Sequence, residues 1–307
     1  MVGVLQGFAI IGIIIALGFF VGRSGLLGEH APSVLSKLVF FVLTPCLLFT
    51  ILAEADVQVL FSSRLLVSAL AAIVCFTVFA LVAALAFRRR LPEVVIGSLS
   101  SGYVNANNIG IPVAAYVIGD ASYSAPVVLA QLLVFAPVAL ALLGASVSGN
   151  FSMRSVLLQT VRNPMLIASA LGVLVAVSGV ELPTVVFEPL RLIGAAAIGV
   201  LLINFGMSLS GSRLLEPGSG RRDVVLASLL KLVVMPLAAF VLARYVFGMQ
   251  GHELFAIVVL AALPTAQNVF NYAQRYDRGV VIARDTILIT TVLCIPVLVL
   301  IALLLKA

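Results

Sequence analysis

The sequence predicts an all-α membrane protein of about ten transmembrane helices, arranged as two inverted five-helix repeats. Three observations support this fold class. The 307-residue chain is 63% hydrophobic and 10% charged, with a mean hydropathy of +1.25, which leaves too little polar surface for a soluble domain. Apolar runs of roughly 20 residues, enough to span the hydrocarbon core, recur along the chain. The two halves of the chain also resemble each other.

The apolar runs give the number and order of the helices. The first run has no basic residue before it and no small-residue cleavage site, so we expect a retained helix. The sixth is short and would sit with little tilt. The expected spans are 4–21, 34–53, 64–87, 94–118, 124–147, 164–180, 185–210, 223–247, 252–275 and 280–304.

The basic residues predict the orientation of the chain. Thirteen of the 18 Lys and Arg residues, among them Lys37 and Arg275, fall in loops after odd-numbered spans, and four fall on the other side. The positive-inside rule then places the odd loops in the cytoplasm and both termini outside, in a multi-pass protein of the cell (inner) membrane. These basic loops are read as signals of topology, so no nucleic-acid partner is expected.

An internal repeat relates the two halves. The stretch 63–87 aligns with 221–247, and 131–144 aligns with 290–305, placing Pro137 over Pro296 at a shift of 159 residues. Each half holds five spans, so the second half enters the membrane with opposite polarity. Such inverted repeats are typical of secondary transporters that work by alternating access. The expected units are a first repeat at 1–147, a cytoplasmic linker at 148–163 and a second repeat at 164–307.

The fourth span of each half carries an irregular sequence, "SGYVNANNIGIP" (101–112) in the first and "AALPTAQNVFNY" (261–272) in the second. Pro112 and Pro264 lack an amide donor, and Gly110 lowers the helix preference. Breaks in a membrane helix survive only where they are buried in protein or line a cavity. We therefore expect helices four and nine to be broken and crossed near the midplane, with these three residues as crossover backbone.

Amide side chains cluster at both expected breaks. Half-helix N-termini that face one point would attract a carboxylate, and amides can bind a ligand through donors and an acceptor. The alternative is that the amides only hold helices together, but two clusters related by the repeat favour a binding site. The predicted substrate-binding residues are Asn105, Asn107, Asn108, Gln267, Asn268 and Asn271.

Lys231 is the only ionisable residue well inside a predicted span. Intramembrane charges usually pair or mark a transport path. We expect its ammonium either to hold half-helix C-terminal carbonyls near the crossing or to contribute to anion attraction. The alternative is a lysine that snorkels to the cytoplasmic interface.

Several functions compete for this pattern. A carrier of small organic anions, working as an exporter or uniporter, needs no cofactor and no metal. The alternative is a Na⁺- or H⁺-coupled symporter of the same fold, with Na⁺ bound by amide oxygens of Gln267, Asn268 and Asn108; the lack of a central carboxylate counts against it. An enzyme is disfavoured because His30 and His252 have no second ligand at metal spacing, and a channel would need a pore ring formed by an oligomer.

Three stretches resemble the auxin efflux carrier family. "NANNIGIP" (105–112) resembles its fourth-helix signature, "LPTAQNVFNYAQRYD" (263–277) is similar to the ninth-helix motif of bacterial members, and "INFGMSLSG" (203–211) is similar to the end of its seventh helix. Val104 and Val269 stand where plant carriers have proline.

The resemblance implies a fold like that of bile acid:sodium symporters, working as an elevator in the cell membrane. Helices 1, 2, 6 and 7 would form a scaffold and a homodimer contact among the lipids, and helices 3–5 and 8–10 a transport domain. Asn105 and Pro112 would match the fourth-helix crossover, and Pro264 and Asn268 the ninth. Bacterial members are associated with malate, malonate and similar organic acids.

Overall fold

The computed structural model describes residues 2–28, 30–54, 63–148, 161–210 and 220–305. These residues are helical, apart from loops and one isolated β-bridge. Most of the linker expected at 148–163 lies outside the described residues, as do Arg154, Arg213 and Lys306 of the charge count. Six described helical segments are long and apolar enough to cross a membrane: Ala31–Ala53, Ser63–Leu85, Ala121–Ser146, Thr184–Met207, Arg221–Val246 and Val280–Leu305.

Shorter apolar helices account for the other expected spans. They are Ala9–Ser24, Ala106–Ile118, Pro164–Ser178 and Gly251–Ala261. Many large apolar side chains on the outer faces of the helices are exposed, for example Leu85 and Val185. Such surface suits lipid and not water. The all-helical membrane fold is therefore confirmed, while the count of ten crossings stays a prediction.

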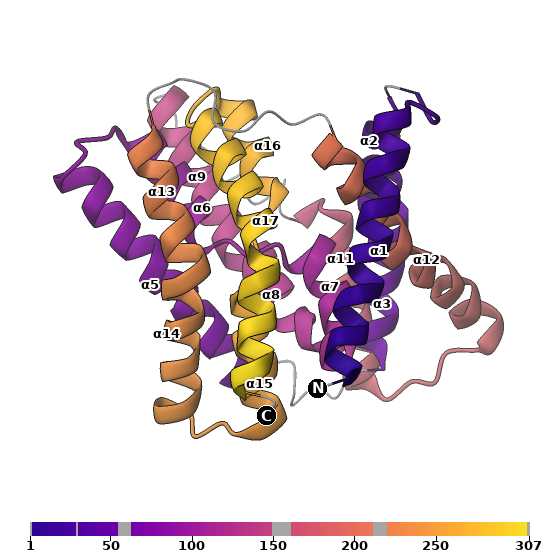
Figure 1. Ribbon diagram of the computed structural model, residues 1–307. Helices are drawn as coiled ribbons and strands as arrows, with labels where there is room; N and C mark the ends of the chain where they lie inside the picture. Colours follow the sequence, from indigo (N-terminus) through magenta and orange to yellow (C-terminus); the bar gives the residue numbers. More distant parts are fainter. Residues whose placement is uncertain (1, 29, 55–62, 149–160, 211–219, 306–307) are drawn as a thin grey trace.

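Two groups of helices stand beside each other (Figure 1). In the first group α1 (Val2–Ser24) packs along α12 (Thr184–Ser210), and α11 (Pro164–Ser178) packs against α3 (Thr44–Ala53). α3 continues the helix that begins with α2 (Ala31–Leu38). Both chain ends lie at the same end of the molecule (Figure 1).

The second group contains the broken helices and their neighbours. α5 (Ser63–Leu85) packs on α6 (Leu91–Gly102), and α13 (Arg221–Leu229) packs on both α6 and α17 (Val280–Leu305).

The remaining elements are η1 (Val39–Leu43), η2 (Ala106–Gly110), α7 (Ile111–Val113), η3 (Ala114–Ile118), η4 (Ala121–Ser124), α8 (Ala125–Ala130), η5 (Gln131–Phe135), α9 (Ala136–Ser148), η6 (Leu230–Val234), α14 (Met235–Val241), η7 (Leu242–Val246), α15 (Gly251–Ala261) and α16 (Gln267–Tyr276).

Four prolines inside helices are each preceded by a π-helical turn. η1, η2, η5 and η6 each end two residues before a proline: Pro45, Pro112, Pro137 and Pro236. A proline ring clashes with the carbonyl four residues earlier in an α-helix, and a wider π turn relieves that clash. These prolines therefore bend or widen their helices without ending them.

Glycines allow α1 and α12 to approach closely. A Cβ atom on Gly18 would lie 2.2 Å from the carbonyl oxygen of Ile203, and one on Gly206 would lie 2.1 Å from that of Ile15. No side chain fits at those distances, because backbone atoms cannot move aside as a flexible side chain can. Small residues at a helix crossing are a common basis of packing in membranes.

Candidate functional site

The two interruptions meet each other. α6 ends at Gly102 and helix resumes at Ala106; α15 ends at Ala261 and helix resumes at Gln267. The extended residues between them pair through an antiparallel bridge of Val104 with Thr265. The Asn105 N–H donates to the Pro264 carbonyl at 2.8 Å, and the Ala266 N–H donates to the Tyr103 carbonyl at 2.9 Å. Each break thus supplies partners for backbone groups of the other, as buried peptide groups require.

Side chains from neighbouring helices satisfy further groups of the breaks. The Gln131 Nε2 atom donates to the Val104 carbonyl at 2.7 Å, and the Thr290 hydroxyl accepts from the Thr265 N–H at 3.1 Å. Thr265 in turn donates its hydroxyl to the Ser100 carbonyl at 2.6 Å. The paired segment is therefore fixed on several sides.

The three residues predicted as crossover backbone lie at different places relative to the two breaks. Pro264 lies in its break, as expected. Gly110 and Pro112 lie beyond the first break, inside the returning helix, because η2 accommodates the proline. Their part in the crossover backbone stays a prediction. Gly110 still contacts the partner segment, since a Cβ on it would be 3.0 Å from Leu263 Cδ1.

Asn105 is a cap for the returning helix. Its side chain is only 3% exposed, and its Oδ1 atom accepts from the Asn108 N–H at 3.1 Å. A side-chain oxygen at this position satisfies an otherwise free N–H of the first turn. Asn105 does not line the cavity that the other predicted amides share.

Lys231 lies against the end of the other broken helix. It is fully buried in the π turn η6, and its Nζ donates to the Ala261 carbonyl at 2.7 Å. Ala261 is the last residue of α15, where the helix dipole is negative. In this position Lys231 can support the carbonyls at the end of the half-helix, while its part in anion attraction stays a prediction.

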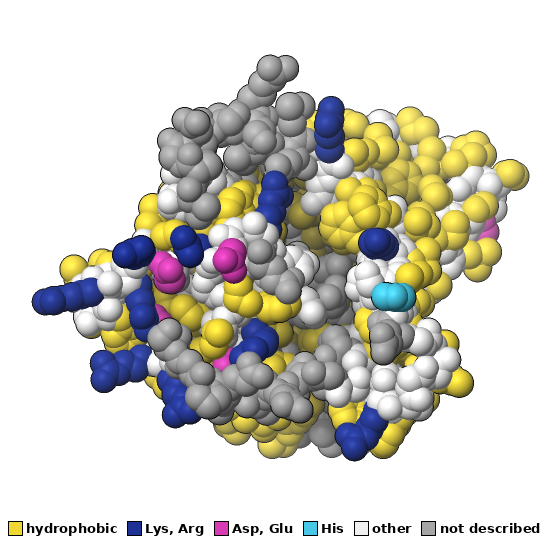
Figure 2. Space-filling model, turned by 90° about the horizontal axis from the view of Figure 1, so that it is seen from above, with side chains coloured by type: hydrophobic (Ala, Val, Ile, Leu, Met, Phe, Trp, Pro, Cys, Tyr) yellow, Lys and Arg dark blue, Asp and Glu magenta, His cyan; other side chains and the backbone are white. Residues whose placement is uncertain are grey.

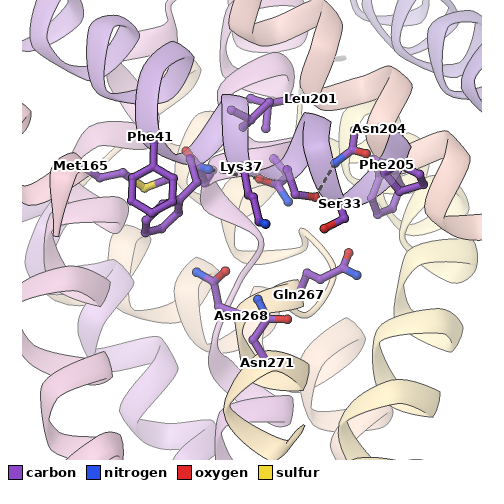
Figure 3. Close-up of a pocket in the computed structure, with 16 residues that line it drawn as sticks. Ser33, Lys37, Phe41, Met165, Leu201, Asn204, Phe205, Gln267, Asn268 and Asn271 are labelled. Carbon is purple, nitrogen blue, oxygen red and sulfur yellow. Dashed lines mark hydrogen bonds between the residues drawn. The ribbon is translucent and has the colours of Figure 1, made fainter. Parts of the chain in front are cut away.

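A cavity of about 430 Å³ opens beside the paired breaks. Five of the six predicted amide residues line it, and Figure 3 shows the three from α16, Gln267, Asn268 and Asn271, gathered on one wall. The described part of the chain holds no group of three His, Cys, Asp or Glu residues that could bind a metal. The lining is that of a site for a small polar ligand.

The opposite wall comes from α2 and α12. Ser33, Ser36 and Lys37 project from α2, and Asn204 from α12 donates its Nδ2 to the Ser36 hydroxyl at 2.9 Å. The sequence pattern did not identify these residues as parts of a site. The charge pattern assigns Lys37 to a cytoplasmic loop, and the only sequence signal for Asn204 is its place in the "INFGMSLSG" motif.

A second cavity of about 610 Å³ adjoins the first. The two cavities share Phe40, Phe41, Met165, Asn268 and Asn271. The second is further lined by Arg162 and Arg275, and none of the described residues that line the two cavities is an Asp or Glu. Figure 2 looks onto the end of the molecule where α2 and α16 lie, and Lys and Arg side chains are scattered across this face.

Comparison with known proteins identifies the family. The model of the membrane transport protein family matches residues 4–302, nearly the whole chain. The chain belongs to this family. The predicted resemblance to auxin efflux carriers is thereby confirmed, because carriers of that name are among the relatives of this membrane transport protein.

Relatives occur in all three domains of life. An uncharacterized transporter of Escherichia coli K12, YfdV, is 26% identical over 275 residues, 86% of each chain. An uncharacterized transporter of Methanothermobacter thermautotrophicus is 28% identical over 285 residues, 92% of this chain and 91% of its own. A probable auxin efflux carrier component 5c of Oryza sativa is 28% identical over 151 residues, 48% of this chain and 40% of its own. The protein is therefore a multi-pass membrane transporter and not an enzyme.

Proposed function

We propose that this membrane transport protein carries a small organic anion, such as a carboxylate, by alternating access. The observation that supports this most is the cavity beside the paired breaks, where amide side chains and Lys37 are among the described lining residues and none of those residues is an acid. The first turn of α16 begins at Gln267, on the cavity wall. Helix N-termini carry free N–H groups and a partial positive charge, which suit an anionic group. A volume of about 430 Å³ accommodates an acid of few carbon atoms.

The crossed, inverted-repeat architecture is part of the proposal. Gln131 and Thr290 stand at equivalent positions of the proposed repeats, 159 residues apart, and each side chain bonds a backbone group of the break in its own half. Two residues at equivalent positions that make equivalent hydrogen bonds support a repeat relation between the two halves of the chain. Two such halves can exchange conformations, which gives the inward-open and outward-open states of a carrier.

The two groups of helices suit an elevator. The group of α1, α2–α3, α11 and α12 is the proposed scaffold, and a homodimer would form through it. The second group carries the paired breaks and is the proposed transport domain. The cavity lies between Lys37 and Asn204 of the first group and the amides of the second, so sliding of one group past the other would move the bound anion.

The proposed location is the cell membrane with both termini outside. Lys37 lines this cavity, and Arg162 and Arg275 line the adjoining one; the positive-inside rule places all three at the cytoplasmic face. Outward movement of one negative charge across an inside-negative membrane gains about 2.3 kcal/mol per 100 mV. Export as a uniport therefore needs no coupled ion.

Flux measurements in proteoliposomes test the proposal. We expect the wild-type protein to move at least one labelled acid from a panel of dicarboxylates and indole acids, and an imposed potential to change the rate. Gln267→Ala should reduce this flux at least several-fold. The absence of flux above empty vesicles for every acid would refute the proposal.

The second candidate is a Na⁺-coupled symporter of the same fold. Its support is the buried Oδ1 atom of Asn107, an acceptor with no hydrogen-bond partner in the described structure. Oxygen atoms are the ligands that hard cations prefer. Flux that is unchanged when choline replaces sodium would favour the uniporter, and flux that requires sodium would favour this candidate.

A further inference from the structure

Lys37 differs from every other residue that lines the cavity of about 430 Å³. It is the one charged residue among the described residues of that lining, which otherwise consists of amides, serines and apolar side chains. A hydrogen bond from a charged donor is roughly twice as strong as one between neutral groups. Lys37 therefore offers a small anion a stronger contact than any single amide of the lining does.

The structure places Lys37 in a helix and not in a loop. α2 begins at Ala31, so Lys37 lies roughly 9 Å of helix rise beyond the start. Figure 3 shows its ammonium directed into the cavity, toward the wall of Gln267 and Asn268. A lysine that served topology alone could extend into solvent.

No protein group neutralises this ammonium in the described structure. The ion pairs there involve Arg64, Arg89, Arg191 and Arg284, and none involves Lys37. The residue is exposed to the cavity and its solvent. Its charge is therefore available to a bound anion.

The backbone that carries Lys37 is held in place. The adjacent Ser36 accepts from Asn204 of α12 at 2.9 Å, and Val39, two residues on, is 5% exposed. These contacts fix the face of α2 that looks toward the amides. Only the flexible side chain of Lys37 needs to adjust to a ligand.

We propose that Lys37 is the specificity-determining cation of the site: its ammonium pairs with the negative group of the transported molecule, while the amides of α16 bind the rest. This assignment rests on the proposed function and adds to it the residue that selects an anion over a neutral analogue. Lys37 and the amides lie on different helix groups, so the site is complete only while the two walls face each other across this cavity.

Equilibrium binding and proteoliposome flux, measured in parallel on the full-length protein, test the assignment. The probes are labelled succinate and indole-3-acetate, with succinamide and indole-3-acetamide as neutral analogues. Lys37→Gln removes the charge and Lys37→Arg keeps it. Arg23→Gln is the matched control, because Arg23 is a basic residue of the same predicted face, at the end of α1, that does not line the cavity.

We expect Lys37→Gln to weaken binding of the preferred acid about tenfold or more, as loss of a charged hydrogen bond does. Its affinity for the neutral analogue of that acid should stay within about twofold of the wild-type value. Lys37→Arg should retain most of the affinity, and Arg23→Gln should match wild type. Acid binding by Lys37→Gln within twofold of wild type would overturn the assignment while leaving the carrier proposal intact.

The two proposals fail in distinguishable ways. Binding that depends on Lys37 without any flux would refute the carrier and support the cation site. If neither acid binds to or is transported by wild type, both are refuted. An equal loss of acid affinity in Arg23→Gln would overturn the assignment of Lys37. It would show that the overall positive charge of this face of the molecule, and not a contact with Lys37, attracts the anion.

Discussion

Asn105 and Asn271 show that two asparagines near the same breaks have different tasks. Asn105 is buried and caps the returning helix through its Oδ1 atom, whereas Asn271 is exposed and lines both cavities. Sequence alone predicted the set of amides but could not separate the helix cap from the residues that line the cavity. Capping depends on the local backbone, and lining the cavity depends on which helices stand opposite. For the same reason the sequence pattern assigns Lys37 only a loop position, since the residues that line the cavity with it, such as Asn204 and Gln267, lie about 170 and 230 positions later.

Asn105→Ala should lower stability through loss of the cap, by about 1 kcal/mol. Asn271→Ala should leave stability unchanged and reduce flux. The midpoint of thermal unfolding in detergent can be followed by a thiol-reactive dye, since Cys75 and Cys294 are buried. An Asn105→Ala midpoint equal to that of Asn271→Ala would contradict the capping role.

The ion pair of Arg89 with Asp223 should contribute to stability. Asp223 is fully buried and accepts from Arg89 Nε at 3.2 Å and from Nη2 at 2.7 Å. Removing one partner of a buried pair costs about 3–5 kcal/mol, and we expect less for Asp223→Asn because the Arg89 side chain is 32% exposed. Glu188→Gln, which breaks the exposed pair with Arg191, should not change the unfolding midpoint; equal effects would contradict the importance of burial.

At the scale of elements, the prolines and glycines predicted the two interruptions but not their bounds. The extended residues of the first break end at Asn105, well before Pro112, because a π turn lets the helix pass the proline. The pattern cannot distinguish a proline that breaks a helix from one that a π turn accommodates. That choice depends on the packing around the preceding carbonyls.

Alanine substitutions at two glycines of α12, only one of which packs closely against α1, should have different effects on the stability of the protein. Gly206→Ala places a Cβ against the Ile15 carbonyl and should destabilise by about 1–3 kcal/mol, as overpacking does. Gly199→Ala, on the same helix, meets nothing within 4 Å and should be neutral or stabilising by up to about 1 kcal/mol through helix propensity. A shift of the same sign in both unfolding midpoints would show that close packing does not govern this contact.

At the scale of the whole molecule, the apolar runs and the repeat predicted the class of fold, and the family match confirms a transporter. The cavity could not be predicted, because its walls come from elements that are distant in sequence: α2 with η1, η2, α11, α12 and α16. Periodicity and motifs describe each helix by itself. They do not say which helices face each other.

The side to which the cavity opens can be measured by cysteine accessibility in a cysteine-free background. Ser33→Cys, on the cavity wall, should react with a membrane-impermeant thiol reagent applied from the cytoplasmic side. Gln250→Cys, exposed in the loop before α15, should react only from outside. Reaction of both from one side would contradict the proposed topology.

The most direct test of the anion site is a high-resolution structure of the wild-type protein with a saturating concentration of an acid that it transports. We predict density for the acid in the cavity beside the paired breaks, with its negative group next to Lys37 and its remaining polar atoms within hydrogen-bond distance of Gln267 or Asn268. Density for the acid at another place, with this cavity filled only by water, would contradict the assignment of the site.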